Sequence, residues 1–164
     1  MAETVFIGIG SNQGDRKSHC EEALRRLSCS PDLKVIKTSP FYETEPVTLN
    51  REQQEWYLNG AVQIQTELTA LSLLSYLKQI EQDMGRTMGE KWSARCIDLD
   101  ILFYGDQILK SERLTLPHPL VTERRFVLEP LAALAPDWRH PEAGKTIAEL
   151  LVALRDPHRV RKVP

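Results

Sequence analysis

The spacing of apolar and polar positions predicts two β-α-β units along the chain. Residues 4–9 are rich in β-forming side chains and run into Gly8-Ile9-Gly10-Ser11-Asn12, a composition typical of a strand that exits into a loop. Asp15 is placed to cap a helix. The apolar face of that helix has the i, i+3, i+4, i+7 spacing, at Cys20, Ala23, Leu24 and Leu27. Residues 33–38 then predict the second strand.

The second unit has the same order. Residues 58–66 predict a strand because apolar or β-branched positions alternate there with glutamines. Thr69 is placed to cap a helix, and Gly85 stands where a left-handed stop would end it. The expected apolar stripe of this helix is Leu71, Leu74, Leu77, Ile80 and Met84.

Residues 96–104 predict a fourth strand with two different faces. One face takes Ile97, Leu99, Ile101 and Phe103, and the other takes Asp98, Asp100, Leu102 and Tyr104. Gly105-Asp106 then predicts a two-residue hairpin turn. Two further helical stretches, residues 126–135 and 147–154, are expected to pack against the core.

This order predicts an α+β fold, a ferredoxin-like split β-α-β sandwich with an antiparallel sheet, helices packed on one face of it and an extra C-terminal helical segment. The 164 residues contain no internal repeat, low-complexity tract or Gly/Ser linker. We therefore expect residues 1–164 to form a single domain.

Composition and charge narrow the class of protein. Lys plus Arg number 21 and Asp plus Glu number 23, and the net charge of −2 argues against binding to nucleic acid or to a membrane through bulk charge. No apolar run approaches the roughly 20 residues of a membrane span, and the acidic N-terminus does not fit a secretory signal. Cys20, Cys29 and Cys96 lack the spacing of a disulfide framework or a zinc site, so a cytoplasmic protein is expected.

Asp98 and Asp100 are the sharpest chemical signal. Two positions apart on a strand, they project from one face with Cα atoms about 6.6 Å apart, and a hard cation such as Mg²⁺ between them would relieve their repulsion. Taken alone, the pair also fits a solvated sheet face. The surrounding cations favour phosphoryl transfer, which needs carboxylate-held metal beside basic clamps. These cations are Arg86, Lys91, Arg95, Arg113, Arg124, Arg125 and the proline-flanked His118.

Aromatic and amide side chains near polar loops predict a pocket for a flat heterocycle. They are Tyr57, Asn59, Trp92 and Phe126, each of which also fits a core or capping position. Gly8-x-Gly10 matches no phosphate-binding signature and is interpreted as a turn.

Taken together, these pieces resemble the 6-hydroxymethyl-7,8-dihydropterin pyrophosphokinase family of folate biosynthesis, from Val5 to about Pro136. The matching segments are Gly8-Ile9-Gly10-Ser11-Asn12, Ser39-Pro40-Phe41-Tyr42-Glu43-Thr44-Glu45-Pro46, Tyr57-Leu58-Asn59, Ile80-Glu81 with Gly85-Arg86, Arg95-x-x-Asp98-Leu99-Asp100, Pro117-His118-Pro119 and Arg124-x-Phe126-Val127-Leu128. The resemblance implies transfer of pyrophosphate from ATP to the pterin hydroxymethyl group, with release of AMP and two Mg²⁺ ions held between the carboxylates and the triphosphate.

The resemblance also implies roles for individual residues. Asp98 and Asp100 would bind both metal ions, with Asp98 a candidate proton acceptor for the pterin hydroxyl, and Arg86 and Arg95 would act with them in catalysis. The implied pterin-binding set is Gly10, Thr44, Val47, Tyr57, Asn59, Trp92 and Phe126. The implied ATP-binding set is Glu81, Arg86, Trp92, Arg95, Ile101, Arg113, Thr115, His118 and Arg124. Residues 86–95 would form a closing loop over ATP.

Some positions depart from the family pattern, and two other functions stay open. Ser93, Leu120 and Glu45 replace residues usual in relatives, and no role follows for Met88 to Lys91. A Mg²⁺-dependent phosphohydrolase could use the same Asp pair, but the base that would position its water is not evident. A sheet-platform RNA-binding module would need exposed aromatics where the strand has aspartates. The expected partners are small molecules, and a monomer is expected.

Overall fold

The computed structural model describes residues 2–11, 14–45, 56–87 and 96–163, the side chains of Arg86 and Thr87 excepted. Its elements, in chain order, are β1 (Glu3–Ser11), α1 (Arg16–Ser28), β2 (Leu33–Thr38), β3 (Tyr42–Thr44), β4 (Tyr57–Thr66), α2 (Ala70–Thr87), β5 (Asp98–Tyr104), β6 (Leu109–Lys110), β7 (Thr115–Leu116), the 3-10 helix η2 (Pro119–Thr122), α3 (Arg125–Leu134), α4 (Ile147–Ala153) and β8 (Val160–Lys162).

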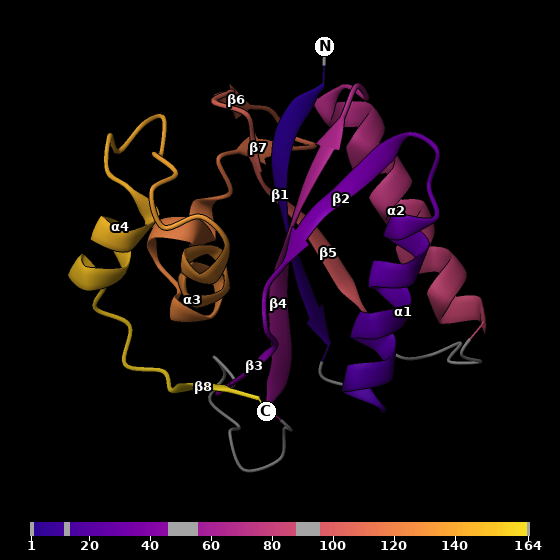
Figure 1. Cartoon of the computed structure of the whole chain (residues 1–164), viewed down its shortest axis with the longest axis horizontal. Helices are drawn as coiled ribbons and strands as arrows, with labels where there is room; N and C mark the ends of the chain where they lie inside the picture. The colour runs from indigo at the N-terminus through magenta and orange to yellow at the C-terminus, as the bar shows by residue number, and fades with distance from the viewer. Residues whose placement is uncertain (1, 12–13, 46–55, 88–95, 164) are drawn as a thin grey trace.

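One antiparallel sheet organises these elements (Figure 1). Its order is β5-β1-β4-β3-β8. Strand β2 also pairs with β4, along residues 62–66, whereas β3 pairs with residues 57–59 of that strand. Strands β1 and β2 are joined by α1, and both pair with β4. Strands β4 and β5 are joined by α2, and both pair with β1. This interleaving of two β-α-β units confirms the ferredoxin-like α+β fold.

Both faces of the sheet are covered, which differs from the expectation of helices on one face. Helices α1 and α2 lie on one side of the sheet, and α3 and α4 lie on the other (Figure 1). Val5, Ile7 and Ile9 of β1 belong to the core under the first pair of helices, whereas Phe6 and Phe103 belong to the core under the second pair. The C-terminal helices therefore form a third layer, because β1 and β5 present apolar side chains on both faces.

The strict alternation expected for β5 is wrong beyond Leu102. The register shifts between the pairs Phe6 with Phe103 and Ile7 with Ile101, so Leu102 is an extra residue on β5. A bulge of this kind turns the following side chains to the opposite face. Phe103 therefore joins Leu102 in the core on the α3 side, and Tyr104 packs on the α1 and α2 side.

The two predicted helix starts are confirmed. Asp15 accepts a hydrogen bond from the Ser18 N–H at 3.1 Å, and Thr69 Oγ1 accepts one from the Ser72 N–H at 3.2 Å. Each side chain satisfies an otherwise unpaired donor in the first turn.

The expected stripe and stop of α2 need correction. Leu73 is 0% exposed and Leu71 is 41% exposed, so the buried stripe starts from Ala70 and Leu73 rather than from Leu71. The helix also continues through Gly85 to Thr87. Glycine permits a left-handed stop but does not impose one.

Four short strands were not predicted. β3 and β8 pair with each other, and β6 pairs with β7 rather than with β5. Gly105 has a φ of +54°, and the Gln107 N–H donates to the Tyr104 carbonyl, so a turn does follow β5, but it is no hairpin turn. In the described segments, no helix combines the length and apolar character that a membrane crossing needs.

The two leucines of α2 test its orientation. Leu73→Ala is expected to lower the free energy of unfolding by about 2–5 kcal/mol, because it empties a buried site. Leu71→Ala is expected to change it by less than about 0.5 kcal/mol. Urea unfolding of the two variants measures the difference, and equal losses would contradict the observed orientation.

Candidate active site

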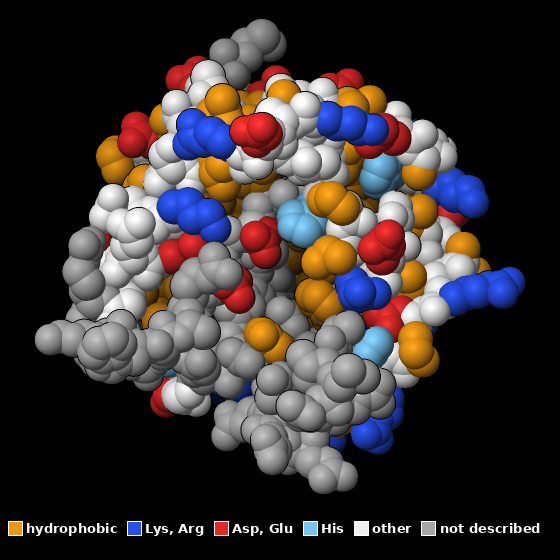
Figure 2. Space-filling model, turned by 180° about the vertical axis from the view of Figure 1, so that it is seen from behind, with side chains coloured by type: hydrophobic (Ala, Val, Ile, Leu, Met, Phe, Trp, Pro, Cys, Tyr) orange, Lys and Arg blue, Asp and Glu red, His pale blue; other side chains and the backbone are white. Residues whose placement is uncertain are grey.

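A cavity of about 280 Å³ lies on the α3 side of the sheet. It is bounded by the ends of β1, β3, β4 and β5, by the first turn of α3, and by the residues around η2. Its lining residues are Gly8, Ile9, Gly10, Thr44, Glu45, Tyr57, Asn59, Gly60, Asp98, Asp100, Leu102, His118, Leu120, Phe126 and Val127. On one face of the molecule, acidic side chains and a histidine lie together beside hydrophobic ones around a hollow (Figure 2).

Gly8 and Gly10 lie inside β1 and line this cavity, so their interpretation as a turn is wrong. At Gly10 a Cβ atom would lie 2.6 Å from Asn59 Oδ1, too close for any real contact. Asn59 in turn donates from Nδ2 to Thr44 Oγ1 at 2.7 Å. Gly10 therefore leaves the space in which the Asn59 amide is held.

A second cavity of about 440 Å³ lies beside β5, the terminal strand of the described sheet. It is lined by Leu74, Lys78, Asp100, Ile101, Glu112, Arg113, Leu114, Thr115, His118, Pro119 and Leu120. Asp100, His118 and Leu120 line both cavities. The two cavities therefore adjoin, with a carboxylate and an imidazole at the boundary.

Asp98 and Asp100 both face the first cavity, as the sequence predicts. Asp100 is exposed and Asp98 is half-buried, so their carboxylates are open to a ligand. Two carboxylates suit Mg²⁺, which binds few protein oxygens, keeps several waters and takes further oxygens from phosphates. The donor set thus fits magnesium, and Lys78 and Arg113 in the adjoining cavity supply positive charge for phosphates.

His118 is held in place by its backbone and by its ring. Its N–H donates to the Leu102 carbonyl at 2.9 Å, which ties the loop to β5. Its Nδ1 accepts from the Leu120 N–H at 3.1 Å. A neutral ring with Nδ1 as acceptor carries its proton on Nε2. His118 can therefore donate a hydrogen bond to an anionic ligand in either cavity.

Glu81 is a buried carboxylate on α2 that contacts β5 between the two aspartates. Its Oε2 accepts from the Leu99 N–H at 2.7 Å, and its Oε1 lies 3.2 Å from Lys78 Nζ. Burial raises the pKa of Glu81 above its ordinary value, and the Asp98 charge adds to this, while Leu99 and Lys78 act in the opposite direction. Glu81 is not among the lining residues recorded for either cavity; it contacts the backbone that carries them.

The structure brings together most of the described residues that the sequence singled out. Gly10, Thr44, Tyr57, Asn59 and Phe126 line the first cavity with both aspartates. Ile101, Arg113, Thr115 and His118 line the second. Arg124 lies at the N-cap of α3 and is recorded in neither lining. Val47, Trp92, Arg95, the side chain of Arg86 and most of the expected closing loop lie outside the described residues.

Several lining residues were not predicted from the sequence, and of these Lys78 and Glu112 are charged. Lys78 precedes Glu81 by one helical turn, a spacing that could have placed it near the same site. Glu45, noted as a departure at a position beside the pterin, does line the first cavity, and its Oε2 accepts from Arg159 Nε at 3.0 Å, a contact that was not predicted. No local signal links these two positions, which are 114 residues apart.

Residues 6–136 match the family model described as 7,8-dihydro-6-hydroxymethylpterin-pyrophosphokinase (HPPK). The chain belongs to this family. It is accordingly a pyrophosphokinase that uses ATP, acts on a pterin and serves folate biosynthesis. The comparisons give no support to the phosphohydrolase interpretation.

Individual relatives agree with this membership. The chain is 40% identical to the 2-amino-4-hydroxy-6-hydroxymethyldihydropteridine pyrophosphokinase of Methylorubrum extorquens, covering 97% of this chain and 98% of the relative. It is 36% identical to the enzyme of the same name from Haemophilus influenzae, covering 98% and 99% of the two chains. A solved Plasmodium falciparum HPPK-DHPS chain shares the fold, with a TM-score of 0.74 at 18% identity. That match covers 93% of this chain and 42% of the Plasmodium chain, so this chain spans less than half of that protein.

The two glycines of β1 give a matched test of the first cavity. Gly10→Ala is expected to displace Asn59 and to raise KM for the pterin by about tenfold or more. At Gly8 the nearest atoms to a Cβ would be Leu102 methyls at 3.4 Å, so Gly8→Ala should fit far better and change KM by less than about threefold. Steady-state kinetics with each substrate varied in turn measures both effects, and equal KM values for the two variants would refute this account of Gly10.

Glu81 predicts a specific dependence of stability on pH. Because the pKa of Glu81 is raised in the folded protein, the folded state binds more protons than the unfolded state above the ordinary pKa of 4.5. Its contribution to the free energy of unfolding should therefore fall as pH rises from 5 to 7. Glu81→Gln should remove this fall, so the wild type should lose stability relative to that variant across the window.

Glu149→Gln is the control for this measurement. Hydrogen bonds from the Thr146 backbone and side chain lower the pKa of the exposed Glu149, so it is ionised in both states above pH 5. Its difference from the wild type should stay constant between pH 5 and 7 in urea unfolding. A constant difference for Glu81→Gln as well would contradict the raised pKa.

Proposed function

We propose that the chain transfers pyrophosphate from ATP to the hydroxymethyl group of 6-hydroxymethyl-7,8-dihydropterin, giving the pterin diphosphate and AMP. The observation that carries this proposal is the position of the two aspartates. Both line a largely apolar cavity, and Asp100 also lines the adjoining cavity, which contains Lys78 and Arg113. Such an arrangement suits a reaction that joins a flat heterocycle to a phosphate chain.

The first cavity is proposed as the pterin pocket. The Asn59 amide, oriented by Thr44, has an oxygen and a nitrogen that can pair with the polar edge of the ring. Tyr57 and Phe126 supply aromatic surface for its faces. Gly10 leaves the space that this arrangement needs. Val47 and Trp92 keep the pterin-binding roles that the resemblance implies, although they lie outside the described residues.

The second cavity is proposed for the nucleotide. Arg113 and Thr115 line it, and Ile101 supplies apolar surface beside them. Lys78 is added to this set because it lines the same cavity. Arg86, Arg95 and Arg124 are proposed as phosphate ligands, and Glu81 is proposed to act in this site by bracing the backbone of Leu99.

Asp98 and Asp100 are the residues that would hold two Mg²⁺ ions. Bound magnesium would neutralise charge that develops on the phosphate oxygens. The chain's own residues would orient the pterin hydroxyl toward the β-phosphorus, and Asp98 would accept the hydroxyl proton. The new bond joins the hydroxyl oxygen to the β-phosphorus, while the bond from that phosphorus to the bridging oxygen of AMP breaks. His118, with its proton on Nε2, would donate to a phosphate oxygen.

We also propose that residues 1–164 act as one monomeric domain in the cytoplasm. β8, near residue 164, pairs within the same sheet as β1, which supports a single domain. Cys20, Cys29 and Cys96 are thiols rather than disulfides, in keeping with a reducing compartment.

The proposal is tested by following AMP, ADP and free phosphate separately with ATP, Mg²⁺ and 6-hydroxymethyl-7,8-dihydropterin. AMP is expected to form in step with the pterin diphosphate, and only when the pterin is present. ADP or free phosphate released without regard to the pterin would instead support the hydrolase.

Asp98→Ala is expected to lower kcat by at least about 100-fold, because it removes a carboxylate from the reacting centre. Its melting temperature should stay close to that of the wild type, since one of two repelling carboxylates is lost. The exposed Asp137→Ala is the matched control and should keep full activity. A fully active Asp98→Ala enzyme would overturn the proposed metal site.

A further inference from the structure

The C-terminal segment that follows α4 connects two opposite walls of the first cavity. Its strand β8 extends the sheet beside β3, with Val160 opposite Thr44. The Glu45 N–H donates to the Arg159 carbonyl at 3.0 Å, and Glu45 Oε2 accepts from Arg159 Nε at 3.0 Å. Thr44 and Glu45 line the cavity, so this segment supports its β3 wall.

The same segment supports the opposite wall through Asp156. Arg124, the N-cap of α3, makes no side-chain cap hydrogen bond. Instead Asp156 Oδ2 accepts from the Arg125 N–H at 3.0 Å, across 31 residues of sequence. The next two residues, Phe126 and Val127, line the cavity. A carboxylate at a helix N-terminus also interacts favourably with the helix dipole.

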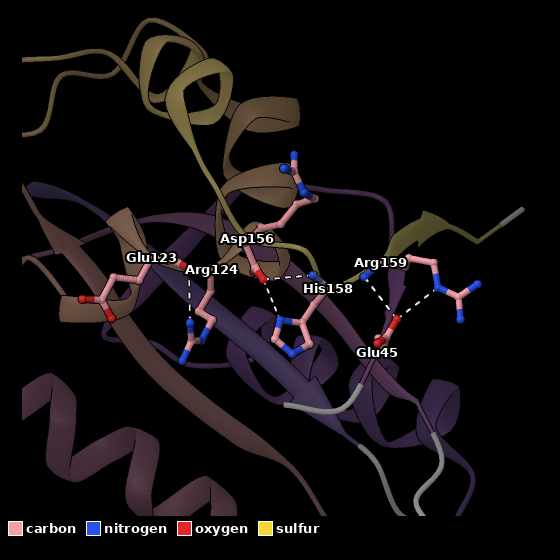
Figure 3. Close-up of polar contacts among 7 residues, drawn as sticks. Glu45, Glu123, Arg124, Asp156, His158 and Arg159 are labelled. Atoms are coloured by element: carbon pink, nitrogen blue, oxygen red, sulfur yellow. Dashed lines mark hydrogen bonds and ion pairs between the residues drawn. The ribbon is translucent and has the colours of Figure 1, made fainter. Parts of the chain in front are cut away.

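Asp156 is itself fixed by His158. Its Oδ1 accepts from the His158 N–H at 3.0 Å and contacts His158 Nδ1 at 2.6 Å. The Asp156 side chain is only 1% exposed, so this carboxylate is enclosed by the protein groups that it contacts. Burial alone would raise the pKa of Asp156, but hydrogen bonds from Arg125 and His158 outweigh it and the pKa is lowered. Figure 3 shows the chain of contacts from Asp156 through His158 and Arg159 to Glu45.

We propose that Asp156 is a positioning residue for the pterin pocket, acting through the first turn of α3 to set the place of Phe126 against the β3 wall. The inference rests on the proposed function, because it depends on the first cavity being the pterin pocket. Asp156 lies outside the cavity lining and so touches neither substrate directly. Its effect should fall mainly on pterin recognition and less on the nucleotide, because, among the described residues, only Arg124 of the proposed phosphate ligands lies at this end of α3.

Asp156→Ala is the main test, measured by steady-state kinetics with each substrate varied in turn. We expect KM for the pterin to rise about tenfold, because a small displacement of a positioned group has a large kinetic effect. KM for ATP should stay within about twofold of the wild type. Asp156→Asn keeps an oxygen for the Arg125 N–H but puts an amide nitrogen against the His158 N–H, so its pterin KM should rise by about threefold rather than tenfold. If Asp156→Ala fails to fold, a pterin KM in Asp156→Asn equal to that of the wild type would overturn the proposal, and a rise of about threefold would support it.

Thr146→Ala is the matched control for stability. It removes the N-cap of the neighbouring helix α4, whose capping box is formed by Thr146 and Glu149, and it lies in neither cavity lining. Loss of such a cap typically destabilises a protein, so the control shows what destabilisation alone does to KM. A pterin KM that rises equally in Thr146→Ala and Asp156→Ala, at matched loss of melting temperature, would show a merely structural role and overturn the proposal.

Asn59→Ala separates the failure of this inference from failure of the proposed function. If Asn59→Ala raises the pterin KM and Asp156→Ala does not, the pocket assignment stands and the positioning role is refuted. If neither variant changes the pterin KM, the assignment of the first cavity to the pterin fails, and the inference fails with it.

Discussion

The pairing of β1 between β4 and β5 is the constraint on which the site depends. Gly10 lies opposite Asn59 on one side and opposite Asp98 on the other, so one residue of β1 sets the relative positions of an amide and a carboxylate. Side chains alternate between faces along a strand, so a slip of one residue would turn the aspartates of β5 toward the core under α1 and α2. The buried residues of β5 oppose such a slip, because it would turn Leu99 and Ile101 out of that core.

The same sheet face serves as a core at one end and as a site at the other. Toward the end of β5 that carries Phe103, aromatic packing closes the face, with the rings of Phe6 and Trp138 4.9 Å apart. Toward its start, Gly8 and Gly10 leave the face open, and the aspartates occupy it. The bulge at Leu102 lies between these two regions, so Leu102 and Phe103 can both pack on the α3 side without moving the aspartates out of register with β1. The glycines therefore leave room for the site, and the bulge allows the core to be packed, on the same face of one strand pair.

The spacing of apolar positions was enough to predict the elements that pack by simple alternation or by a helical stripe. The residue type before each helix was enough to predict the caps at Asp15 and Thr69. It failed where a tertiary contact decides the outcome. Leu71 and Leu73 are equally apolar, and only the position of α2 on the sheet determines that Leu73 is buried. The aspartate pair could be predicted because two residues of one strand carry it. The contact of Arg159 with Glu45 could not, because 114 residues separate the two. The roles of the pterin residues came from family resemblance, since a single tyrosine or asparagine has no local signature of binding.

The boundary between the two cavities explains why this site favours transfer between substrates over attack by water. His118 and Leu120 form that boundary, and the hydrogen bond from the His118 N–H to the Leu102 carbonyl ties them to the strand that carries the aspartates. The boundary is therefore fixed relative to the carboxylates, because a movement of β5 would move the boundary residues and the aspartates together. On one side, apolar surface from Leu102, Phe126 and Val127 gives water few partners, whereas a flat ring fills the same space with contacts on both faces. In the proposed assignment, an occupied pterin pocket would place a hydroxyl, rather than a water molecule, beside the aspartates, which is the arrangement that group transfer requires.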